Sequence, residues 1–316
     1  MDTPVDASSL LSKPGHDPQG AVLAAERRRN GRPSYVSRNL VPLLRVTPPA
    51  DGAGSSPPDA ATLRAAKACA ACRDGTQIFP FTMAFQPIVD MHAGRIDAYE
   101  ALVRGPGGEG AGHVLGQVTA ENTYAFDQAC RVKAIGLASR LGIDRQLSIN
   151  FLPNAVYQPQ ACIQATLRAA ASTGFPRDRL TFEILESETI ADTGHLMAII
   201  TEYRKHGFKI ALDDFSTGYS GLARLAELKP DIIKVDRALV QNCDKDRTRL
   251  AIIASLISLG NEIGVKVVVE GVEQASEVAA LRSVGARFIQ GFYFAKPLFE
   301  GAVRDSDIPW TIPAAP

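Results

Sequence analysis

The sequence predicts an α/β fold, a closed barrel of alternating strands and helices that follows a long polar arm. Short apolar runs alternate with helical patterns from about residue 146 to residue 290. Most of these runs carry a polar residue inside them or at their end. So many β-α units in one domain of about 225 residues favour a parallel sheet closed into a barrel.

Composition narrows the classes of partner and compartment. The chain has 316 residues, with 34 basic and 34 acidic side chains, so charge gives no reason to expect DNA or an anionic membrane as a partner. The longest apolar runs are too short to cross a bilayer. The cysteines show no disulfide-framework spacing, which favours a reduced, cytoplasmic setting. They are Cys69, Cys72, Cys130, Cys162 and Cys243.

Three segments follow from the composition along the chain. Residues 1–75 are rich in Pro, Ala, Ser and Gly and lack sustained apolar periodicity, so we expect a disordered, low-complexity N-terminal arm. Residues 76–302 form the barrel domain, and residues 303–316 form a C-terminal tail that packs on the barrel or hangs free. The lone pair Cys69-Ala-Ala-Cys72 is a weak metal signal. The arm is a candidate segment for binding a regulatory partner.

The ordered part begins with a predicted hairpin. Residues 83–90 and 95–103 read as strands joined by a turn at residues 92–94, and residues 105–112 read as a flexible glycine-rich loop. A helix is predicted at 126–141. Strands are then expected at 146–151, 180–185, 208–214, 231–235, 265–270 and 288–290, alternating with helices at 155–172, 192–206, 222–228, 247–263 and 274–284.

Polar residues recur in or at the end of these strands, about one per unit. Because the active site of a parallel barrel forms where the C-terminal strand ends meet, we expect these side chains to converge on one mouth. They are Glu100, Asn150, Glu183, Asp213, Asp214, Lys234, Glu270 and Gln290.

This set predicts a site for hard divalent metal ions. Glu100, Asn150, Glu183, Asp213 and Asp214 all offer oxygen ligands, which favours Mg²⁺ or Mn²⁺ over zinc. Adjacent aspartates could bridge two ions about 3.5–4 Å apart, an arrangement used for in-line phosphoryl transfer. A solvated Asp-Asp turn without metal is the alternative interpretation of the pair.

Three basic or acidic residues complete the predicted chemistry. Lys234 could orient a metal-bound water or steady charge that develops on a phosphate. Glu270 could be a metal ligand or accept the proton of the water. Arg104 follows the strand of Glu100 and suits a phosphate oxygen.

The ordered motifs resemble those of the EAL-domain cyclic di-GMP phosphodiesterase family. The resemblance covers roughly residues 80–300 and rests on Glu100-Ala-Leu-Val-Arg104 together with the stretches at 86–90, 148–150, 182–187, 213–220, 233–236, 270–273 and 290–294. It implies a modified (β/α)8 TIM-type barrel, the EAL fold, with one antiparallel strand. It also implies hydrolysis of cyclic di-GMP to linear pGpG with Mg²⁺ or Mn²⁺, and a homodimer formed through the barrel.

The resemblance also implies individual roles. Glu100, Asn150, Glu183 and Asp213 would hold one metal ion, and Asp213 with Asp214 would reach a second. Lys234 and Glu270 would serve the hydrolytic water, while Gln86, Arg104 and Gln290 would contact or enclose the substrate. Glu186 would anchor the loop after Asp214, and Glu273 would support the strand end near Glu270. We therefore place Lys234, Glu270 and Glu100 in the catalytic group, with Glu270 also among the metal ligands.

Two positions depart from the family pattern. Gly105 stands where the family usually has tryptophan, and Ser216 stands where it usually has the first glycine of the loop after Asp214. Serine would be strained if that position needs a positive φ, so altered regulation is expected. The competing interpretations are a catalytically weak EAL module that acts as a cyclic di-GMP receptor or protein-interaction domain, and an unrelated metal-dependent barrel lyase or aldolase.

Overall fold

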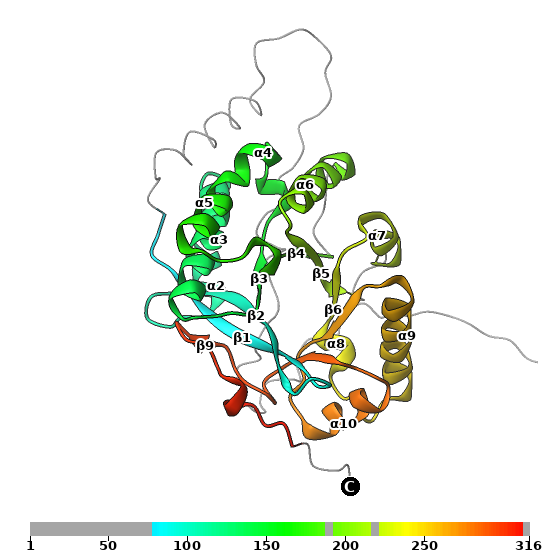
Figure 1. Ribbon diagram of the computed structural model, residues 1–316. Helices are drawn as coiled ribbons and strands as arrows, with labels where there is room; N and C mark the ends of the chain where they lie inside the picture. Colours follow the sequence, from blue (N-terminus) through cyan, green and yellow to red (C-terminus); the bar gives the residue numbers. More distant parts are fainter. Residues whose placement is uncertain (1–77, 187–191, 216–220, 312–316) are drawn as a thin grey trace, which may run out of the picture. The chain divides into compact units, whose positions relative to one another are not determined.

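The computed structural model of the protein describes residues 78–186, 192–215 and 221–311 (Figure 1). The expected disordered arm at 1–75, the Cys69–Cys72 pair and Ser216 lie outside these residues. The three cysteines within them are buried free thiols. In the described part of the chain, no helix has the length and apolar character needed to span a membrane.

Eight strands close into a barrel, which confirms the predicted fold class. Their order around the barrel is β2-β3-β4-β5-β6-β7-β8-β1, and β1 returns to pair with β2. Only β1 runs antiparallel to its neighbours β2 and β8 within this ring of described strands. The strands are β1 (Thr82–Asp90), β2 (Arg95–Arg104), β3 (Gln146–Asn150), β4 (Leu180–Leu185), β5 (Lys209–Phe215), β6 (Ile232–Val235), β7 (Lys266–Val269) and β8 (Phe288–Gln290).

The helices lie outside the ring of strands (Figure 1). Most lie at the predicted positions. The apolar stripe from which each was predicted is the face that covers the outer side of the strands. They are α2 (Ala111–Leu115), α3 (Thr123–Arg140), α4 (Pro159–Cys162), α5 (Gln164–Thr173), α6 (Thr193–Lys205), α7 (Gly221–Leu228), α8 (Arg237–Val240), α9 (Arg247–Ile263) and α10 (Ala275–Ser283).

Three local predictions differ from the structure. The single helix expected at 155–172 is broken into a 3₁₀ turn at Pro153–Ala155, then α4 and α5. Pro159 explains the break, because it lacks the amide proton of a helix interior and therefore begins a new helix. The glycine-rich loop ends in the short helix α2, and α8 follows β6 directly, capped by the Asp236 carboxylate.

Inside the barrel, side chains are stacked in layers below the site. A small apolar cluster contains Ile88, Ala98, Ala211, Ile232 and Val268. Since side chains on a strand return to the same face every second residue, the residues two positions further along β2, β5, β6 and β7 face the same interior. Those residues are Glu100, Asp213, Lys234 and Glu270. The apolar layer thus forms the floor beneath the polar residues.

The chain's C-terminal segment returns to the barrel wall. Leu298–Phe299 forms a short strand, β9, paired with β1. Beyond it, the Tyr99 hydroxyl donates to the Val303 carbonyl at 2.5 Å, and the amide of Ile96 donates to Asp305 at 2.5 Å. Ile308 is buried. Residues 303–311 therefore lie against β2 rather than apart from it.

Candidate active site

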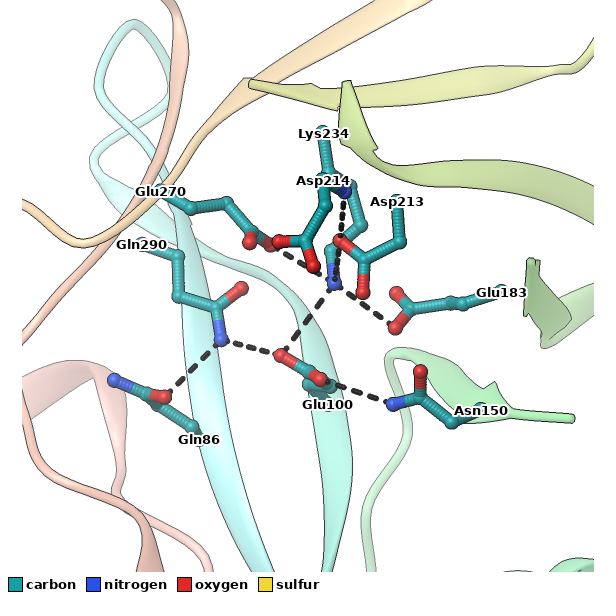
Figure 2. A network of polar contacts seen from close by, with 9 residues as sticks. All are labelled: Gln86, Glu100, Asn150, Glu183, Asp213, Asp214, Lys234, Glu270 and Gln290. Carbon is teal, nitrogen blue, oxygen red and sulfur yellow. Dashed lines mark hydrogen bonds and ion pairs between the residues drawn. The ribbon is translucent and has the colours of Figure 1, made fainter. Parts of the chain in front are cut away.

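Nine of the predicted site residues meet at the C-terminal mouth of the barrel (Figure 2). All eight strands contribute, with Glu270 directly after β7. The nine residues lie within one network of hydrogen bonds and ion pairs. The nine are Gln86, Glu100, Asn150, Glu183, Asp213, Asp214, Lys234, Glu270 and Gln290. Barrel closure brings them together although they span more than two hundred positions of the chain.

A local irregularity of β5 presents both aspartates to the site. In a regular strand, neighbouring side chains point to opposite faces. Here the pairing of β5 with β6 passes from Leu212 opposite Ile233 to Phe215 opposite Val235, so two residues oppose the single Lys234. Asp214 has a φ of 53°, a left-handed conformation that Asp tolerates better than most residues. This bulge lets Asp213 and Asp214 offer oxygens to one cluster.

Lys234 is the positive centre of the cluster. Its side chain is 1% exposed, and its ammonium contacts four carboxylates. The Nζ–oxygen distances are 2.8 Å to Glu270, 2.9 Å to Glu183, 3.1 Å to Asp213 and 3.6 Å to Glu100. Burial alone would lower the pKa of Lys234, but the surrounding carboxylates raise it well above its ordinary value. The residue therefore remains an ammonium.

The carboxylates outnumber that single cation. Burial raises the pKa of Glu183 to about 8, with Lys234 acting in the opposite direction. Burial and then the Asp213 charge raise the pKa of Asp214 to about 8, aided by a hydrogen bond with Asp236. Burial also raises the pKa of Asp213, and raises that of Glu270 well above its usual range. The cluster consequently retains protons unless further positive charge is supplied.

The residues present fit divalent metal ions. Two groups of three carboxylate oxygens each lie within 4.8 Å of one another, and Asp213 belongs to both. The first group is Glu100, Glu183 and Asp213, and the second is Asp213, Asp214 and Glu270. The buried Oε1 of Glu183 has no hydrogen-bond partner among the described residues, a cost that a coordinated ion would remove. An all-oxygen set suits a hard cation such as Mg²⁺ or Mn²⁺.

Amide side chains hold Glu100 in a fixed orientation. The Asn150 amide nitrogen donates to Oε1 of Glu100 at 3.2 Å, and the Gln290 amide nitrogen donates to Oε2 at 2.7 Å. Gln290 also donates to Gln86 at 3.2 Å, and Gln86 donates to the Ala295 carbonyl at 3.1 Å. Because Asn150 uses its nitrogen toward Glu100, its carbonyl oxygen is left to face a cation.

Three further predicted residues are not among these nine. Arg104 ends β2, four residues beyond Glu100, and donates to the Val103 carbonyl at 2.7 Å. Glu186 begins the segment after β4, and a Cβ added at Gly221 would lie 3.0 Å from its Oε1. Glu273 pairs with Arg237 at 2.8 Å. Arg237 in turn packs on Gly271, which follows Glu270 and has a φ of 71°.

Gly105, one of the two positions that depart from the family pattern, packs closely against Glu109. A Cβ added at Gly105 would lie 2.2 Å from Oε2 of Glu109. The same oxygen accepts a hydrogen bond from the Gly107 amide at 2.9 Å, and the Gly105 amide donates to the Glu109 carbonyl at 2.9 Å. Glu109 thus lies over Gly105, and a large side chain at position 105 would require it to move.

Two contributors to the site went unassigned at the level of sequence. Asp236 lies in the stretch 233–236 that carries the family resemblance and has no predicted role, yet it hydrogen-bonds Asp214 and caps α8 through the Ala238 amide at 2.6 Å. Its signal was available, since it follows Lys234 by two residues and precedes a helix. Gly291 is packed so closely that an added Cβ would lie 2.0 Å from the Val272 carbonyl oxygen. No periodicity would have revealed that contact.

Comparison with known proteins places the chain in a family. The family described as the EAL domain matches residues 73–297, so the protein belongs to the EAL domain family. This confirms the resemblance drawn from the motifs, and the modified barrel agrees with it.

Solved structures and a curated relative resemble the chain along the same region. A standalone versatile EAL protein from Vibrio cholerae O395, in its c-di-GMP-bound form, is 45% identical, with a TM-score of 0.70; the match covers 72% of this chain and 97% of that one. The manganese and cyclic di-GMP complex of Klebsiella pneumoniae BlrP1 is 35% identical, with a TM-score of 0.67, covering 70% and 57%. The blue light- and temperature-regulated antirepressor BluF of Escherichia coli (strain K12) is 30% identical, covering 69% and 54%. The chain thus spans about half of the length of that curated relative, and a smaller share of the length of other curated relatives.

Proposed function

We propose that the protein hydrolyses cyclic di-GMP to linear pGpG in a reaction that depends on Mg²⁺ or Mn²⁺. The observation that carries this proposal is the pair of carboxylate groups that share Asp213, with the Lys234 ammonium at their centre. Such an arrangement suits two ions beside a scissile phosphodiester. The c-di-GMP-bound and manganese-bound EAL structures among the similar proteins support the choice of ligand and ion class.

The proposed metal ligands are the oxygen-bearing residues of the mouth. Glu100, Asn150, Glu183 and Asp213 would hold one ion, and Asp213, Asp214 and Glu270 would hold the other. When bound, the ions would supply Lewis acidity and lower the pKa of a water molecule. The two ions would also replace the protons that the buried carboxyls otherwise retain.

The remaining residues would position the reactants. Lys234 is close enough to the carboxylates to hold a water beside them and to offset negative charge developing on the phosphate. Glu270, whose carboxylate lies 2.8 Å from the Lys234 ammonium, is the candidate to accept the proton of that water. Glu100, with an oxygen 3.6 Å from the Lys234 ammonium, would act beside these two residues in the catalytic group. Gln86, Gln290 and Arg104 would contact the substrate, since the first two lie on the rim formed by β1 and β8 and Arg104 ends β2.

A second function is favoured by one observation. The relative that is 30% identical to this chain is named as an antirepressor, which is a regulatory role and not a hydrolytic one. A catalytically weak module that binds cyclic di-GMP or a protein is therefore the competing proposal. The filled set of oxygen ligands favours the enzyme, because a receptor has no need of a two-ion site.

The deciding experiment incubates the purified full chain with cyclic di-GMP and separates the products by chromatography. We expect pGpG with Mg²⁺ or Mn²⁺ and none with a chelator. Asp213→Asn should abolish the product, whereas Asp178→Asn should not, because Asp178 lies before β4, at the opposite end of the barrel. Binding of cyclic di-GMP without any product would support the receptor. Neither binding nor product would refute both the enzyme and the cyclic di-GMP receptor, and would leave a protein-interaction module.

Segments and assembly complete the proposal. We propose that residues 76–302 are the catalytic domain and that the segment at 1–75 binds a regulatory partner. We also propose that the domain acts as a homodimer through the barrel. Sedimentation of the full chain and of a chain beginning at residue 76, each compared with turnover, tests the catalytic domain and the dimer. A monomer with full activity would remove the dimer from the proposal.

A further inference from the structure

A fully buried ion pair lies behind the wall of the barrel, away from the catalytic mouth. Arg131 of α3 is 0% exposed and Asp127, one turn earlier on the same helix, is 3% exposed. The Arg131 guanidinium donates to Asp127 and, at 2.8 Å, to the Tyr203 hydroxyl of α6. Its Cζ lies 5.9 Å from the centre of the Phe182 ring in β4. One guanidinium therefore joins α3, α6 and β4.

Holding a helix in place through a buried ion pair has a high energetic cost. Each buried ion loses its hydration, and well-packed apolar residues usually hold helices at least as firmly. Burial alone would lower the pKa of Arg131, but the Asp127 carboxylate raises it above its already high value, so the residue stays charged. A role in packing alone does not account for two buried charges.

The pair reaches the backbone that carries a proposed metal ligand. The second oxygen of Asp127, Oδ1, accepts a hydrogen bond from the Leu152 amide at 3.0 Å. Leu152 lies two residues after Asn150. Between them, the Phe151 amide donates to the Glu183 carbonyl at 3.1 Å. Asp127 thus fixes the segment that ends β3 and, through it, the end of β4.

The aromatic partners of the pair act on the same two strand ends. Phe151 follows Asn150, and Phe182 precedes Glu183, so their rings point outward where the ligands point inward. The Tyr203 ring lies 5.5 Å from the Phe151 ring and 5.0 Å from the Phe182 ring, between centroids. Tyr203 is itself held by Arg131. The residues adjacent to both ligands are therefore packed on one element that the ion pair orients.

We propose that Asp127 and Arg131 are positioning residues that hold Asn150 and Glu183 in register and thereby set the affinity of the site for its divalent ion. The inference rests on the metal site of the proposed function. Groups that orient metal ligands typically change metal affinity by about 10- to 100-fold when they are removed. Because Asp127 acts through the backbone, about tenfold is the expected loss.

The test measures binding of Mn²⁺ to the full chain from the electron paramagnetic resonance signal of the free ion. Urea denaturation of each variant without metal accompanies it. Asp127→Leu should weaken Mn²⁺ binding about tenfold, because leucine offers the Leu152 amide no acceptor. The matched control is Asp90→Leu, because Asp90 is also buried and bonded to a guanidinium, that of Arg287 at 2.7 Å, and to backbone amides. Asp90 ends β1 at the opposite end of the barrel and should leave Mn²⁺ affinity unchanged.

A double variant separates positioning from stability. Asp127→Leu with Arg131→Met removes both charges, so the urea midpoint should return toward that of the wild type. The Leu152 amide stays without its acceptor, so Mn²⁺ binding should remain weak. Affinity that recovers together with stability, or equal affinities for Asp127→Leu and Asp90→Leu, would overturn the inference. A wild-type chain that fails to bind Mn²⁺ would instead overturn the metal site itself, and this inference with it.

Discussion

Replacing Lys234 by methionine tests the electrostatics of the site most directly. Methionine has a similar length and no charge, so the change removes one ammonium from among four carboxylates and adds little strain. At an effective dielectric constant of about 20, one ion pair at about 3 Å is worth roughly 5 kcal/mol before desolvation. Three of the four contacts fall between 2.8 and 3.1 Å. Breaking a buried pair costs about 3–5 kcal/mol net.

Two consequences follow for the variant. Without metal, the free energy of unfolding should fall by about 3 kcal/mol, at the low end because the freed carboxyls can take up protons instead. With Mg²⁺, that difference from the wild type should shrink, since the ions replace the missing charge. Turnover of cyclic di-GMP should fall by about 100- to 1,000-fold because a preorganised charge at the reacting phosphate is lost. Binding of the dinucleotide should change far less.

The assay combines urea denaturation with and without Mg²⁺, product formation, and equilibrium binding in chelator. Lys266→Met is the matched control, because Lys266 pairs with Asp97 at 2.7 Å at the opposite end of the barrel interior. The control should retain turnover. Turnover of Lys234→Met within tenfold of the wild type would refute the catalytic assignment. An equal loss in both lysine variants would show that the effect lies in stability rather than in the site.

Three further outcomes are expected. Between about pH 5 and pH 8 the metal-free protein should lose stability as the pH rises: Glu183 and Asp214 hold protons up to about pH 8 when folded but ionise near 4.5 and 3.8 when unfolded, so the folded state binds more protons in that window. Thermal unfolding at pH 6 and pH 8 measures this, and Mg²⁺ should remove the difference; equal stability at both pH values without metal would contradict it. Asp213→Asn should abolish turnover, since both carboxylate groups contain this residue, and residual activity above a tenth of the wild type would argue against a shared ligand. Gly291→Ala should destabilise the protein by about 1–3 kcal/mol because the Val272 carbonyl cannot move aside, and an unchanged urea midpoint would show that the contact can relax.

Much of the fold could be predicted because its signals are local and repeated. The strands and most helices carry clear apolar periodicity, and the polar strand ends recur once per unit. Predictions were wrong where a single residue outweighs a pattern. Pro159 breaks a stretch whose composition favours one helix, and a one-residue offset in β5 is invisible to an alternating pattern. Likewise, Asp236 acquires its contact with Asp214 only from that offset.

The sequence by itself determined the family, the barrel and the kind of polar side chains at its mouth, since each of these follows from residue types at fixed spacing. Only the tertiary structure decided how those side chains combine. The bulge at Asp214 brings two neighbouring carboxylates to one face, and closure of the barrel places Lys234 within 3.6 Å of four acids. The buried pair of Asp127 and Arg131 likewise depends on the tertiary structure, because Asp127 contacts Leu152, which lies 25 positions away in the sequence. Charge and distance act through space, so their balance exists only once the chain has folded.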